Sequence, residues 1–196
     1  MKLILASSSP RRIELLKKLV EDFEIKPAEI EEHLDAKKSA AENTQRLSVG
    51  KARKSFEPSS LTLGFDTLGE LDGIPFGKPR DKKKAVELLQ KLSGKTHSVI
   101  SSFCAKSDAE EMTGSEVTHV TFRELSNAEI EKYVQENPVE DYAGAYAVQG
   151  EAKKFVEKVE GEIETVIGFP LHSIKKILAS EIFLTQMDST TSEPAS

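Results

Sequence analysis

The stretch LILASSSPRRIELLKKL, residues 3–19, runs from a short apolar segment directly into an amphipathic helical pattern. Leu3 to Leu5 predict a buried strand, and apolar residues recur at helical spacing from Ile13 to Leu19. Ser9 is expected to cap this helix and Pro10 to begin it, because the first helical residue needs no partner for its N–H. The stretch therefore predicts a strand-to-helix turn.

This turn combines three serines with two arginines. The start of a helix carries unpaired N–H groups and partial positive charge, so it suits an anion such as phosphate. Arg11 and Arg12 oppose the helix dipole by about 0.3 to 1 kcal/mol each, and their presence favours a bound anion. An ordinary helix start explains Ser9 and Pro10 equally well, so both interpretations stay open.

Composition restricts the class of protein. The chain has 196 residues, 31% of them charged, and a net charge of −6, which fits a soluble protein of one medium domain or two lobes. The acidic balance disfavours nucleic acid as a partner, and no apolar run suits a membrane span or a signal peptide. The single cysteine, Cys104, favours a reducing, cytoplasmic location.

Helical and strand patterns alternate along the chain. Helices are expected within 39–56, 82–94, 126–137 and 170–180, and strands or hairpins within 23–35, 59–81, 95–107, 114–125 and 153–169. Several strands are joined by short turns, so we expect an α/β fold with a mixed sheet. The folded domain is expected over residues 1–184, followed by a disordered polar tail over 185–196.

Acidic side chains are the first candidates for chemistry. Asp66 in LTLGFDT is expected at the end of an apolar strand, where it could bind Mg²⁺ or accept a proton from water. A turn aspartate is the simpler alternative. Glu31, Glu32 and Asp35 form a second acidic group that would suit Mg²⁺ if it faced phosphate, although a solvated surface is the default interpretation.

Cationic and amide side chains complete the set of candidates. Lys51 and Lys78 suit phosphate oxygens, and Gln149, between two loop glycines, suits the edge of a nucleobase. Each also has a plain interpretation, as a surface lysine or a loop residue. The sequence contains no Walker A or G-x-G-x-x-G motif, and its four histidines lack metal-ligand spacing.

Seven stretches together resemble the Maf family of nucleoside triphosphate pyrophosphatases: LASSSPRR, GFDT, DGIPFGKPRD, LSGKTHSV, VTFREL, AGAYAVQG and VIGFPL. They occur in the family's order between about residues 2 and 180. The resemblance implies a two-lobed mixed α/β fold related to ITP pyrophosphatases (Maf/Ham1 architecture), usually homodimeric. It implies metal-dependent cleavage, with Mg²⁺ or Mn²⁺, of a nucleoside triphosphate to the monophosphate and pyrophosphate.

The resemblance also implies roles for individual residues. Asp66 would be the proton acceptor and, with Glu32, a metal ligand. Base selection would involve Arg11, Thr67 and Gln149, and the pattern of Arg11 and Gln149 is similar to the branch acting on dTTP and UTP. The phosphate and metal site would comprise Ser8, Arg12, Glu32, Lys51 and Lys78.

Three residues depart from the family pattern: Phe65, Tyr142 and Thr165. We expect Phe65 and Tyr142 to narrow the pocket and so to affect substrate preference. Two alternative functions remain: a non-catalytic, nucleotide-binding regulator of septum formation, and a nucleic-acid binder that uses Arg11, Arg12 and the basic residues of 51–54.

Overall fold

The computed structural model describes residues 2–180, so the predicted tail at 185–196 lies outside the described residues. Within them, seven strands form one mixed sheet in the order β2-β1-β3-β5-β6-β7, with β4 also paired to β3. β1 pairs in parallel with β2 and β3, and the other pairs are antiparallel. The strands are β1 (Lys2–Leu5), β2 (Glu24–Ile25), β3 (Ser60–Leu71), β4 (Ile74–Phe76), β5 (Thr96–Lys106), β6 (Glu111–Phe122) and β7 (Val156–Glu160).

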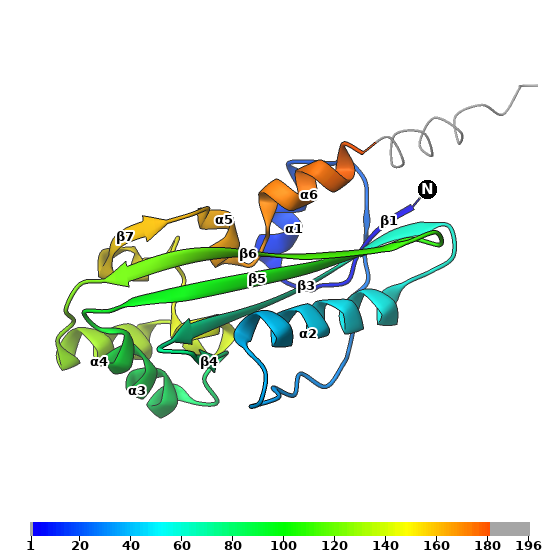
Figure 1. The fold of residues 1–196 in the computed structure, drawn as a ribbon. Helices are drawn as coiled ribbons and strands as arrows, with labels where there is room; N and C mark the ends of the chain where they lie inside the picture. The colour runs from blue at the N-terminus through cyan, green and yellow to red at the C-terminus, as the bar shows by residue number, and fades with distance from the viewer. Residues whose placement is uncertain (1, 181–196) are drawn as a thin grey trace, which may run out of the picture.

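Six α-helices surround this sheet in the described residues. They are α1 (Pro10–Lys17), α2 (Ala40–Ser55), α3 (Lys82–Leu92), α4 (Asn127–Glu136), α5 (Ile163–Ile167) and α6 (Leu171–Leu178). Figure 1 shows α2 running along β3 and β5, with α1 beside α6 and α3 beside α4. The prediction of a mixed α/β fold is confirmed, and no helix in residues 2–180 is long and apolar enough to cross a membrane.

The core divides into two large clusters, in agreement with the two-lobed expectation. One cluster packs α1 and α6 against β1 and β3 through residues such as Leu16, Phe65 and Ile174. The other packs α3 and α4 against β5 and β6 through residues such as Leu89, Phe122 and Ile130. The long strands β3 and β5 connect the two clusters, so a site along β3 lies between them.

One local prediction is wrong, and another is confirmed in position only. Residues 153–169 do not form a hairpin, because only β7 is extended and the chain then enters α5. Ile163, Val166 and Ile167 recur at helical spacing, and Gly168 ends the helix at φ 102°, a left-handed conformation that favours glycine. Ser9 does begin α1, with Pro10 as the first residue, but its side chain makes no capping hydrogen bond.

The strand β3 also extends further than predicted. Asp66 lies in the middle of β3 instead of at its end. On one edge of β3, however, β1 pairs only as far as Leu63 and β4 pairs only from Gly69. The segment between them has an open edge, and Asp66 lies within it. The open edge exposes backbone groups of this segment, whereas the Asp66 side chain projects from a face of the sheet and is 8% exposed.

Substituting Gly64 with Ala is expected to lower the free energy of unfolding by about 2–3 kcal/mol. A Cβ at this position would overlap the carbonyl oxygen of Ser48 and lie 2.6 Å from the backbone nitrogen of Ala52, so α2 would have to move away from β3. Gly50→Ala is the matched control, because its nearest neighbour would be the flexible Ile30 side chain at 3.3 Å. Urea unfolding of both variants measures the difference, and equal stabilities would contradict the packing argument.

Candidate active site

A buried lysine connects two carboxylates at the open edge of β3. Lys51 extends from α2, and its Nζ lies 2.6 Å from Oδ1 of Asp66 and 2.6 Å from Oε1 of Glu32. The side chains of Lys51 and Asp66 are 10% and 8% exposed, whereas Glu32 is 55% exposed. The position of Lys51 follows from the close packing of α2 on β3. The three predicted residues therefore form one centre, open to solvent on the Glu32 side.

The two carboxylates of this centre have different environments. Burial raises the pKa of Asp66, although the charge and hydrogen bond of Lys51 and the charge of Arg12 act against it. Partial burial also acts to raise the pKa of Glu32, but Lys51, Lys78 and Arg12 outweigh it and lower that pKa. Asp66 is therefore the better proton acceptor of the pair, because an effective general base has a pKa raised toward the working pH.

Arg12 lies next to this centre and is held by four hydrogen bonds. Its Nε donates to the carbonyl of Gly168 (2.8 Å), and its Nη1 to the hydroxyl of Ser7 (3.2 Å) and the carbonyl of Phe65 (3.3 Å). Its Nη2 donates to the hydroxyl of Thr67 at 3.1 Å. A guanidinium has five N–H donors, so within residues 2–180 one of them has no hydrogen-bond partner. Burial lowers the pKa of Arg12 to about 10, which leaves it charged at neutral pH.

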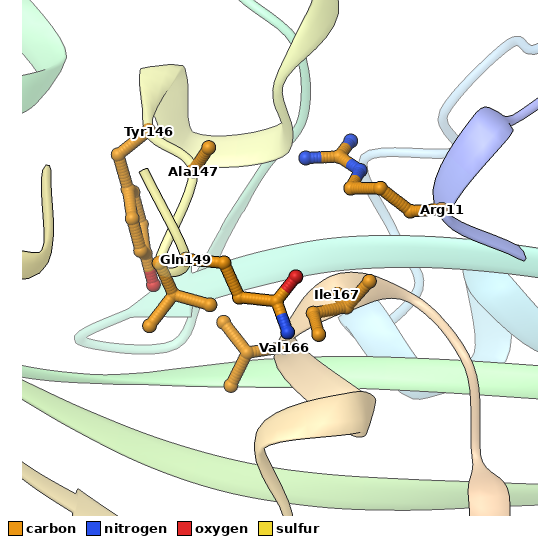
Figure 2. Close-up of a pocket in the computed structure, with 7 residues that line it drawn as sticks. Arg11, Tyr146, Ala147, Gln149, Val166 and Ile167 are labelled. Carbon is orange, nitrogen blue, oxygen red and sulfur yellow. The ribbon is translucent and has the colours of Figure 1, made fainter. Parts of the chain in front are cut away.

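Arg11 and Gln149 meet in a separate small pocket. Figure 2 shows Arg11 reaching from α1 toward the loop that carries Ala147, with Gln149 and the α5 residues Val166 and Ile167 completing the wall. The cavity has a volume of about 30 Å³, too small for a nucleobase, and the exposed Gln149 side chain forms part of its wall. The pocket brings the guanidinium of Arg11 and the amide of Gln149 into one wall.

The remaining predicted residues lie around these two groups. Thr67 does not line the small pocket; its hydroxyl accepts from Arg12 and hydrogen-bonds to Ser101 at 2.9 Å. Lys78 is exposed and close enough to Glu32 to lower its pKa, and Ser8 is exposed beside Ser7. Asp35 does not join the centre, because its side chain accepts from the backbone N–H of Lys37.

The three departures from the family pattern also have definite positions. The expectation that Phe65 narrows the pocket is wrong, because its ring is fully buried against Phe169, with centroids 5.2 Å apart. Tyr142 lies under Arg11, whose guanidinium carbon is 5.0 Å from the ring centroid. Thr165 is buried and donates from its hydroxyl to Glu116 at 3.1 Å.

Sequence reasoning missed the residues that support Arg12 and Thr67. Ser7 and Gly168 accept hydrogen bonds from Arg12, and Ser101 connects Thr67 to the carbonyl of Thr165 at 2.7 Å. Ser7 stands in the quoted turn and Gly168 in the VIGFPL stretch, so the motifs contained part of the signal. Ser101 gave no signal, because its partners are 34 and 64 residues away.

The donor set at the centre fits a hard divalent cation. Because one ammonium contacts both Asp66 and Glu32 at 2.6 Å, one cation could be reached by oxygens of both carboxylates. Mg²⁺ is commonly bound by one or two carboxylates together with substrate phosphates. In residues 2–180 no group of three or more His, Cys, Asp or Glu side chains could hold a metal ion without such help.

Behind the small pocket, a buried histidine predicts a pH dependence of stability. Burial lowers the pKa of His97 to about 4, from an ordinary value of 6.5. The unfolded chain binds a proton at His97 more tightly than the folded protein does. The contribution of neutral His97 to the free energy of unfolding is therefore complete above pH 6.5 and is lost progressively as the pH falls toward 4. His97 is expected to contribute about 2 kcal/mol to the loss of stability between pH 7 and pH 5.

Urea unfolding of the wild type and of His97→Gln at both pH values measures this contribution. The variant should lose about 2 kcal/mol less than the wild type over this interval, because glutamine does not titrate. His119→Gln on β6 is the control, since His119 is exposed. An identical loss in all three proteins would show that His97 does not titrate with a lowered pKa.

The fold and site together define a mixed α/β protein with a buried carboxylate–lysine centre at an open sheet edge. The chain belongs to the Maf-like protein family, whose model matches residues 2–181. It is 43% identical over 178 residues to the dTTP/UTP pyrophosphatase of Thermosipho africanus, covering 91% of this chain and 92% of the relative. It is 41% identical over 185 residues to the dTTP/UTP pyrophosphatase of Aquifex aeolicus, and the match covers 91% of this chain and 94% of the relative. It is 39% identical over 178 residues to that of Bacillus pumilus, and this match covers 90% of this chain and 94% of the relative.

Proposed function

We propose that this chain is a nucleoside triphosphate pyrophosphatase that hydrolyses dTTP and UTP, including modified pyrimidine nucleotides, to the monophosphate and pyrophosphate. The observation that carries the proposal is the joining of Asp66, Lys51 and Glu32 in one centre at the open edge of β3. The names of the relatives support the same activity. Hydrolysing the modified nucleotides before they enter nucleic acids would be a housecleaning role.

The geometry supports a division of tasks within the site. Asp66 orients a water molecule toward the α-phosphorus and accepts its proton, which its raised pKa favours. Lys51, Lys78 and the remaining N–H of Arg12 bind phosphate oxygens, with Ser8 at the edge of the same turn. Arg11 and Gln149 bind the base, and Thr67 holds Arg12 in place.

Asp66 and Glu32 are the residues that would hold Mg²⁺ or Mn²⁺. When bound, the ion would neutralise charge that develops on the phosphate oxygens. Lys51 contacts the same two carboxylates, so it would turn toward the phosphates as the ion binds.

The test is pyrophosphate release from a panel of canonical and modified nucleoside triphosphates, with and without Mg²⁺ or Mn²⁺. We expect many turnovers per enzyme with dTTP and UTP in the presence of the metal. Binding without turnover would instead favour the non-catalytic regulator of septum formation. A steep salt dependence of binding to DNA or RNA would favour the nucleic-acid binder.

Gln149→Glu is expected to lower kcat/KM for UTP and dTTP by about tenfold, because the carboxylate cannot donate the hydrogen bond that the amide can. Gln149 is exposed, so the folded state should be unaffected. Glu151→Gln, also exposed and two residues further along, is the control for the opposite charge change. An unchanged kcat/KM for both nucleotides would remove Gln149 from base recognition.

We also propose that the protein acts in the cytoplasm as a homodimer, without nucleic-acid or membrane partners. The family resemblance supports the homodimer, and the buried single thiol of Cys104 suits a reducing compartment. The net charge of −6 disfavours a nucleic-acid partner. Sedimentation equilibrium of the full chain would give its oligomeric state.

A further inference from the structure

One loop joins the two ends of the proposed substrate site. We call residues 143–149 the pocket loop. Near its start, the backbone N–H of Gly144 donates to the carbonyl of Gly77 at 3.1 Å, next to Lys78. Its other end carries Gln149, and Tyr146, Ala147 and Val148 line the same small pocket (Figure 2). A shift of this loop would therefore move a proposed phosphate ligand and the proposed base ligand together.

The pocket loop has a backbone conformation that needs support from its surroundings. Gly144 and Ala145 both have positive φ angles, 78° and 65°. Glycine tolerates this region, but alanine rarely adopts it, and such strain persists only where neighbouring contacts determine the conformation. Ala145 is fully buried, so its conformation is set by the packing around it.

Tyr146 provides the principal support. Its side chain is 5% exposed, and its hydroxyl lies 2.8 Å from Nε2 of His97, a residue of β5 that is 2% exposed. Its ring packs edge-on against Phe122, with centroids 4.9 Å apart. In the next residue, the backbone N–H of Ala147 donates to the hydroxyl of Tyr133 on α4 at 3.3 Å. The loop is thus attached to both the sheet and a helix of one lobe.

The His97–Tyr146 pair has no other hydrogen-bond partner in the described residues. Nδ1 of His97 is buried and makes no hydrogen bond there. The aromatic rings recorded against the pair are those of Phe76 and Phe122, which carry no charge. In the described residues, the hydrogen bond between His97 and Tyr146 is therefore the polar contact that joins the pocket loop to β5.

We propose that His97 and Tyr146 are positioning residues for base selection, which hold the pocket loop so that Gln149 and Lys78 engage the base and the phosphates of one nucleotide. The inference rests on the proposed function, and it assigns a role in specificity to two residues that do not themselves react. Tyr146→Phe keeps the ring in the core and removes only the hydrogen bond. The loop then gains freedom where Gln149 reads the base.

The experiment measures kcat/KM for UTP and for CTP in the wild type, Tyr146→Phe, His97→Gln and the control His119→Gln. The readout is the ratio of the two kcat/KM values, because this ratio does not depend on the fraction of folded enzyme. In Tyr146→Phe we expect the ratio to fall about fivefold, through KM, with kcat for UTP within about twofold of the wild type. His97→Gln keeps a hydrogen-bonding group toward Tyr146 and should retain most of the ratio, and His119→Gln should match the wild type.

An unchanged ratio in Tyr146→Phe, with a lowered melting temperature, would overturn the proposal and leave the pair a purely structural role. An equal loss of kcat for both nucleotides would overturn it as well, since selection would be intact. If the wild type itself releases no pyrophosphate from any nucleotide, the proposed function is wrong and the inference falls with it. The wild-type measurement therefore distinguishes the two failures.

Discussion

Asp66→Asn is expected to lower kcat for pyrophosphate release by a factor of about 10²–10⁴ while the protein stays folded. The amide cannot accept a proton from water and is a weaker cation ligand than the carboxylate. The fold should tolerate it, because burial raises the pKa of Asp66 and thus already disfavours its charged form. Lys51 would keep its contact with Glu32. Steady-state pyrophosphate release from UTP and dTTP measures the loss, and urea unfolding checks the fold.

Asp72→Asn is the matched control for this substitution. Asp72 is exposed at the β3–β4 turn with φ 51°, a conformation that asparagine also adopts readily, and the charge change is the same. Its kcat should equal that of the wild type. Activity of Asp66→Asn within about threefold of the control would mean that the centre of Asp66, Lys51 and Glu32 is not where the chemistry occurs.

Arg12→Ala is expected to lower the free energy of unfolding by about 2–4 kcal/mol and to remove most of the activity. The substitution leaves four acceptors without their donor: the carbonyls of Gly168 and Phe65 and the hydroxyls of Ser7 and Thr67. These acceptors belong to the turn before α1, to β3 and to the end of α5, so their relative positions depend on the guanidinium. Urea unfolding and pyrophosphate release measure the two effects.

Arg11→Ala is the control for Arg12→Ala. It also removes a cation at the start of α1, but it leaves the four hydrogen bonds of Arg12 in place. The guanidinium of Arg11 stacks on Tyr142 and faces the small pocket, so we expect a raised KM with a stability change below about 1 kcal/mol. Equal destabilisation by Arg11→Ala and Arg12→Ala would contradict the assignment of the four hydrogen bonds as the support of this region.

The quoted turn shows how far local patterns reach. The sequence predicts the start of a helix at Ser9 and Pro10, and α1 begins there. The interpretation of the turn as an anion site treats Arg11 and Arg12 alike. Adjacent residues in a helix point in different directions, so the two side chains can reach different sites. In the structure Arg12 turns toward β3 and Arg11 toward Gln149, so the pair divides between two sites.

The residues 153–169 show where a local pattern is ambiguous. The sequence predicts a hairpin here, but only the first half is extended. The short apolar run after Gly161 fits a strand and a helix equally by its composition, and α5 contains only Ile163–Ile167. The helix is favoured because its apolar residues pack against the core of the second lobe, a contact that no local pattern contains.

By itself, the sequence determined the strand-to-helix turn, the order of helices and strands up to residue 152, the mixed sheet and the set of residues with suitable chemistry. Those features depend on short-range periodicity, capping and turn residues, which act over a few positions. Only the tertiary structure decided that Asp66 lies in the middle of a strand, that Lys51 joins it to Glu32, and that Arg12 hydrogen-bonds to four groups of the described residues. Each of these depends on strand register and on the packing of α2 against β3, which bring together groups separated by 15 to 156 residues.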